Sequence, residues 1–159
     1  MNRIVESVSA ALVIAILGAL ALVPAESAAS PPATGSGSYV VTGAVVTGVR
    51  TAGGNTFVSE TETVTATGTF VGTLVHDLVV TFRADGSLTF RGSGTFTGSL
   101  GGLSGTLEYT VEGQGSVVTG QLSGSFPITR GTGDLAGVRG HVTIEGAPAT
   151  GGTYTVQFK

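Results

Sequence analysis

A two-residue alternation of apolar and hydroxylated side chains recurs along the chain from about residue 39 onward. In the clearest run, Val64, Ala66 and Phe70 alternate with threonines, as in a strand with one face in a core and the other in solvent. No window after residue 39 has the spacing of an amphipathic helix. The pattern therefore predicts an all-β domain with essentially no helix.

Glycine-rich turns divide the alternating runs into short segments. We expect strands at residues 39–49, 57–66, 68–75, 77–83, 87–97, 104–112, 116–127, 138–145 and 153–158. Asp85-Gly86 is the clearest hairpin signal, because this dipeptide adopts the positive backbone angles of a type I′ turn. Eight or nine short strands of this kind suit a closed barrel or a sandwich.

The segment Gly131–Gly140 is rich in glycine and leads into the alternating run His141–Glu145. Glycine at this density allows sharp turns and close contact between strands. Together with Gly152–Phe158, the segment resembles the end of the allene oxide cyclase-like barrels, a clan that includes plant dirigent proteins and bacterial families of unknown function. The resemblance extends in character over residues 56–158. It implies a closed, antiparallel, eight-stranded barrel. The plant proteins are often trimeric, so the resemblance also implies a homo-oligomer as one alternative for this protein.

The N-terminal segment has the order of a secretory signal peptide. Arg3 is followed by an apolar stretch over residues 8–23 and by small residues at Ser27, Ala28 and Ala29. We expect cleavage after Ala29, with Ala28 and Ser27 as neighbouring sites, and a secreted protein. An uncleaved membrane anchor is the alternative, although the apolar stretch is slightly shorter than the ~20 residues of a spanning helix.

Residues 30–159 are enough for one domain with its own core. We expect a flexible leader at residues 30–38, which has no apolar periodicity, and a barrel domain at residues 39–159. The chain contains no cysteine, so packing and sheet hydrogen bonds must stabilise an exported domain. Its 7 basic and 10 acidic residues are scattered, which excludes a basic stripe for nucleic acid. Membrane contact is expected only through the signal peptide before cleavage.

Glu60 and Glu62 are candidate catalytic residues. Two positions apart on a strand, they share the face of Val64, Ala66 and Phe70, which places them at a barrel mouth. A carboxylate beside an apolar interior has a raised pKa and can act as an acid or base. The alternative is a solvated strand end without chemistry.

Five aromatic side chains on apolar strand faces are the candidate ligand-binding residues: Phe70, Phe90, Phe96, Tyr109 and Phe126. They either fill the core or line a cavity for a small apolar ligand. Three hypotheses follow: a secreted binding protein, a cofactor-free isomerase or cyclase of the allene oxide cyclase or dirigent type, and a structural module without a cavity. We expect no cofactor under any of them.

The two histidines offer little for metal or triad chemistry. His76 and Asp77 are adjacent, so a strand points them to opposite faces. His141 and Glu145 share a face that is polar throughout, which favours a solvated outer wall. With two histidines and no cysteine, a zinc site lacks its usual ligands.

Overall fold

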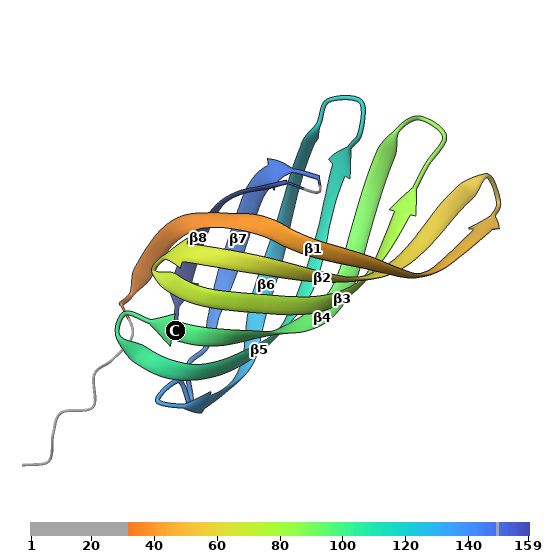
Figure 1. Ribbon diagram of the computed structural model, residues 1–159. Helices are drawn as coiled ribbons and strands as arrows, with labels where there is room; N and C mark the ends of the chain where they lie inside the picture. The colour runs from red at the N-terminus through yellow and green to blue at the C-terminus, as the bar shows by residue number, and fades with distance from the viewer. Residues whose placement is uncertain (1–31, 149) are drawn as a thin grey trace, which may run out of the picture.

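The computed structural model describes residues 32–148 and 150–159. These residues form eight strands: β1 (Thr34–Ala52), β2 (Asn55–Gly68), β3 (Phe70–Phe82), β4 (Ser87–Leu100), β5 (Leu103–Ser116), β6 (Gln121–Gly133), β7 (Gly140–Ala147) and β8 (Gly151–Phe158). Neighbouring strands pair antiparallel, and β8 pairs with β1, so the sheet closes into a ring that we call the barrel (Figure 1). The predicted all-β, eight-stranded antiparallel fold is confirmed. The predicted signal peptide, residues 1–29, lies outside the described residues.

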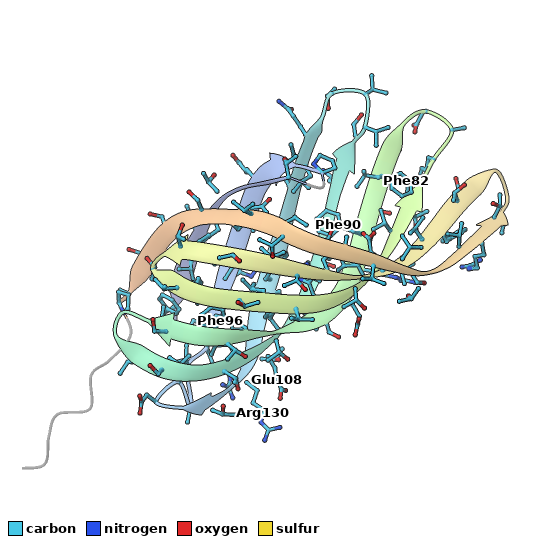
Figure 2. All side chains as sticks on the ribbon, in the orientation of Figure 1. Phe82, Phe90, Phe96, Glu108 and Arg130 are labelled. Atoms are coloured by element: carbon cyan, nitrogen blue, oxygen red, sulfur yellow. The ribbon has the colours of Figure 1, made fainter. Side chains whose placement is uncertain are left out.

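The two ends of the barrel differ in how the strands are connected. The β1–β2, β3–β4 and β5–β6 hairpins diverge at one end, which we call the hairpin end (Figure 1). The β2–β3 and β4–β5 turns and the longer β6–β7 connection lie at the opposite, closed end, together with the C-terminus. Phe82, Phe90 and Phe96 lie at successive levels between these ends (Figure 2).

The fold begins earlier than the predicted boundary at residue 39. β1 starts at Thr34, and its residues Thr34–Val40 pair with Gly151–Gln157 of β8. Most of the predicted leader is therefore strand. The sequence pattern missed it because backbone hydrogen bonds to two neighbouring strands hold this segment without any apolar periodicity.

β3 joins two segments that the sequence divided at residue 76. Leu74, His76 and Leu78 all face the interior, so the alternation continues through the histidine, which is only 5% exposed. The predicted strand at residues 116–127 is also corrected. Ser116 ends β5, and β6 begins only at Gln121, because the residues between them form the hairpin turn.

The β3–β4 hairpin is confirmed, but its turn differs from the predicted type I′. The turn hydrogen bond runs from Gly86 N to Arg83 O at 3.0 Å, so Ala84 and Asp85 are the central residues. Gly86 follows with a φ of 81°, as in a three-residue hairpin loop that ends on a left-handed glycine. Hydrogen bonding from Ser87, first from its side chain and then from its backbone N, which lies 2.8 Å from the Asp85 carboxylate, lowers the pKa of that carboxyl.

The glycine-rich segment Gly131–Gly140 forms the cover of the closed end. Its central residues connect β6 to β7, and Leu135 within them is fully buried. The Asp134 backbone N donates to Ser104 O at 2.9 Å, and the Asp134 carboxylate accepts from Ser104 N at 3.2 Å. These bonds attach the connection to β5. We call the apolar side chains that pack beneath it the closed-end plug: Leu100, Leu135, Val138 and Val156.

Interior glycines let tyrosine rings lie flat across neighbouring strands. Tyr154 of β8 lies over Gly37 of β1 and Gly68 of β2, where an added Cβ would come within 2.4 Å and 3.3 Å of its hydroxyl oxygen. That hydroxyl donates to Thr67 O at 3.0 Å and accepts from Phe70 N at 2.8 Å. The ring therefore ties together β8, β1, β2 and β3, which explains why glycines occupy inward positions.

Candidate ligand cavity

The barrel interior is not filled. A cavity of about 240 Å³ runs along the interior. Its lining includes Phe70 toward the closed end and Phe82 toward the hairpin end, and that lining is mostly apolar. All five predicted aromatic residues line it: Phe70, Phe90, Phe96, Tyr109 and Phe126. Each of them is also at most 9% exposed, so the rings serve as core and cavity wall at once. The interior therefore contains open space as well as packed side chains.

A row of polar side chains crosses the cavity wall on neighbouring strands. Glu62 of β2 lies opposite His76 of β3, His76 opposite Gly94 of β4, and Gly94 opposite Tyr109 of β5. Glu62 Oε2 is 3.0 Å from His76 Nε2, and His76 Nδ1 is 3.2 Å from the Tyr109 hydroxyl. We call Glu62, His76 and Tyr109 the polar row.

Gly94 makes the contact between histidine and tyrosine possible. A Cβ at this position would lie 2.6 Å from the Cβ of His76 and 2.6 Å from the Tyr109 hydroxyl. Because glycine has no side chain, Tyr109 extends across β4 to reach β3. The ring of Tyr109 also stacks on Phe126 at a centroid distance of 5.4 Å, which fixes its orientation.

The direction of the hydrogen bonds along the polar row depends on whether His76 is neutral or protonated. With Glu62 ionised and His76 neutral, Nε2–H donates to the carboxylate and Nδ1 accepts the Tyr109 O–H. With His76 protonated, both ring nitrogens donate, and the Tyr109 proton is free to point elsewhere. Burial, followed by the charge of Glu62, raises the pKa of Tyr109, so this group stays a neutral hydroxyl and acts as a donor.

Glu60 and Glu62 both line the cavity. Glu62 lies opposite His76, the middle residue of β3, and both glutamates pair with β1 residues beyond Val40, where the pairing of β1 with β8 ends, which is consistent with the predicted position at the barrel mouth. Glu60 lies two residues nearer the hairpin end along β2, opposite Leu78. Burial and then the neighbouring charge of Glu62 raise the pKa of Glu60, while the charge of His76 partly opposes this.

Tyr39 of β1 adds a further hydroxyl to the cavity wall. Its oxygen is shielded from solvent and has no hydrogen-bond partner among the described residues. The oxygen lies over Gly146 of β7, where an added Cβ would be 2.6 Å away. Burial and then the charge of Glu62 raise the pKa of Tyr39 to about 12.

His76 is the residue that sequence reasoning missed. Asp77 points to the face opposite to that of His76, as expected, and accepts a hydrogen bond from the Thr61 hydroxyl. The partners of His76 are instead 14 and 33 residues away, on β2 and β5. The available signal was the apolar alternation of β3, which places His76 on the inner face. His141 and Glu145 are exposed on the outer wall, as predicted.

Residues 32–148 and 150–159 contain no group of three His, Cys, Asp or Glu side chains arranged to hold a metal ion. Within the same ranges, no helix is long and apolar enough to cross a membrane.

These features define a class: a closed, antiparallel, eight-stranded β-fold with a mainly apolar internal cavity and a buried polar row. No family model matches the chain, and no curated protein matches its sequence. Among solved structures, the chain is similar to a protein with unknown function from the DUF3224 family of Shewanella oneidensis MR-1. The match has a TM-score of 0.61 at 17% identity and covers 79% of this chain and 95% of that chain. A likeness at this identity shows the fold alone.

Proposed function

We propose that the protein binds a small, mainly apolar molecule inside the barrel. The observation that carries this proposal is the cavity of about 240 Å³, lined by apolar side chains around a few fixed polar groups. That combination is typical of small-molecule sites, in which apolar area supplies affinity and polar groups supply orientation. The volume lies just below the ~300 Å³ at which sites for drug-sized ligands begin, so the ligand is small.

Filling the cavity tests the proposal. Ala66 is 3% exposed and lines the cavity, so Ala66→Phe places a ring inside it, at an overpacking cost of about 1–3 kcal/mol if little room remains. The adjacent Thr65 is exposed, and Thr65→Phe adds the same ring to the outer wall. We expect 2-ethylnaphthalene to bind the parent and Thr65→Phe in equilibrium dialysis but not Ala66→Phe. Equal binding to all three proteins would place the ligand outside the barrel.

A second candidate function is a cofactor-free isomerase or cyclase, which the polar row and Glu60 favour. These groups combine a carboxylate with a raised pKa, a histidine and a neutral tyrosine hydroxyl in one apolar chamber. Such a set can hold a reactive molecule and transfer a proton to or from it. Once a substrate is found by screening, Glu62→Gln should lower turnover by about 10²–10⁴ with little change in ligand affinity. Unchanged turnover would exclude Glu62 as the proton carrier.

We further propose that residues 1–29 direct export, which fits a binding or catalytic role outside the cell. The support is the order of charge, apolar stretch and small residues at the N-terminus. Mass spectrometry of the secreted protein should find a chain that begins near Ser30. A secreted chain that still begins at Met1 would contradict cleavage.

A further inference from the structure

The polar groups of the cavity are unbalanced in charge. Glu60 and Glu62 contribute two carboxylates, whereas none of the described residues that line the cavity is Lys or Arg. The one lining side chain among them that can become positive is His76, and its Nε2 already contacts Glu62 at 3.0 Å. With both carboxylates ionised, the group is net negative in either charge state of the histidine.

Glu60 is the carboxylate that remains available. Glu62 Oε2 is engaged with His76, but Glu60 forms no hydrogen bond or ion pair with any described residue. On a strand, residues two apart place their Cα atoms about 6.5–7 Å from each other, so both side chains project into the same part of the cavity. Burial and then the neighbouring charge of Glu62 raise the pKa of Glu60.

Tyr39 contributes a separate observation. Its hydroxyl is shielded from solvent and has no hydrogen-bond partner among the described residues, whereas the hydroxyls of Tyr109 and Tyr154 are hydrogen-bonded. A buried polar group without a partner costs free energy and requires an explanation, and a ligand that completes the hydrogen bonding provides one. Tyr39 and Glu62 line the same cavity, and burial followed by the charge of Glu62 raises the pKa of Tyr39.

We propose that the cavity selects a mainly apolar molecule that carries one amino group, with the ammonium between Glu60 and Glu62. An ammonium has three donors and no acceptor, which matches carboxylates and a tyrosine oxygen. An anionic amphiphile would instead add a third negative charge to an apolar chamber without a cation to pair it. This inference rests on the proposed binding function and specifies the chemistry of its ligand.

The test uses naphthalenes that share one ring system and differ in charge. The probes are 2-(aminomethyl)naphthalene, 2-(hydroxymethyl)naphthalene, 2-ethylnaphthalene and 2-naphthoate, with dissociation constants measured by equilibrium dialysis at neutral pH. We expect the amine to bind the parent protein about tenfold or more tightly than the alcohol, and the carboxylate to bind weakest. A charge-assisted hydrogen bond accounts for a difference of this size.

Glu60→Gln assigns the preference to its residue. We expect it to weaken binding of the amine about tenfold and to leave 2-ethylnaphthalene unchanged. Glu145→Gln removes the same charge from the exposed outer wall and should leave binding of the amine unchanged.

The outcomes separate this inference from the function on which it rests. Equal affinity for the amine, the alcohol and the carboxylate would overturn the charge preference while keeping the binding function. Preference for the carboxylate, or a Glu145→Gln effect as large as that of Glu60→Gln, would overturn the inference as well. Failure of all four probes to bind would overturn the binding function together with it.

Discussion

The closed end and the cavity of this barrel both combine apolar side chains with a tyrosine, but they differ in packing and in whether the tyrosine hydroxyl is hydrogen-bonded. Toward the closed end, Leu135 is fully buried in apolar packing, and the hydroxyl of Tyr154, a cavity-wall residue, bonds to the backbone of Thr67 and Phe70. In the cavity, the Tyr39 hydroxyl has no partner among the described residues, and Glu60 lies against apolar walls. One end is thus packed for stability, whereas the other retains polar groups and space that a stability optimum would remove.

Truncation of the closed-end plug should have the largest effect. Leu135→Ala removes a fully buried side chain from the centre of the packing, and we expect a loss of about 2–5 kcal/mol in the free energy of unfolding. The matched variant Leu74→Ala truncates a side chain that already borders the cavity and should cost less. Chemical denaturation of both proteins measures the difference. Equal losses would mean that the closed-end plug and the cavity wall are packed alike.

The connection over the closed end depends on a left-handed glycine. Gly137 has a φ of 84° and no atom within 4 Å of an added Cβ, so a side chain there is opposed by backbone strain and not by a clash. We expect Gly137→Val to cost about 1–3 kcal/mol. Gly137→Asn should cost less, because asparagine tolerates this conformation. Unchanged melting of Gly137→Val would indicate that the connection relaxes without disturbing the plug.

Removing the hydroxyl of Tyr154 and that of Tyr39 in turn compares a hydrogen-bonded tyrosine with one that has no described partner. Tyr154→Phe leaves Phe70 N without its acceptor, and we expect a loss of about 1–3 kcal/mol. Tyr39→Phe removes a hydroxyl that has no described partner, so its stability should equal or exceed that of the parent. Thermal and chemical unfolding of the two variants provide the measurement. A destabilised Tyr39→Phe would show that this hydroxyl is bonded in solution.

Glu60 should give the smallest effect, which appears in the pH dependence of stability. Because the folded protein raises the pKa of Glu60, its folded state binds this proton more tightly than the unfolded state does. The resulting stabilisation is present below the ordinary glutamate pKa and is lost as the pH rises through the raised value. Glu60→Gln should therefore gain stability relative to the parent between about pH 4 and pH 7. A difference in melting temperature between Glu60→Gln and the parent that stays constant over this pH range would contradict the prediction.

Much of the fold was predictable from local patterns. Side chains alternate along any strand, so the apolar face of β2, the inward aromatics and the Asp85-Gly86 hairpin followed from sequence spacing. The start of β1 and the turn at Arg83–Gly86 were not predicted. Both depend on which backbone groups find partners, and the apolar pattern does not report that.

The sequence by itself therefore determined the strand content, most of the inward faces and the candidate carboxylates, because side-chain direction is a local property of the backbone. Only the tertiary structure decided which inward residues meet. It brought His76 between Glu62 and Tyr109 through the register of four strands, with Gly94 as the gap that the tyrosine crosses. It also decided that the interior is hollow, because the remaining volume depends on how the side chains of all eight strands fill the closed ring.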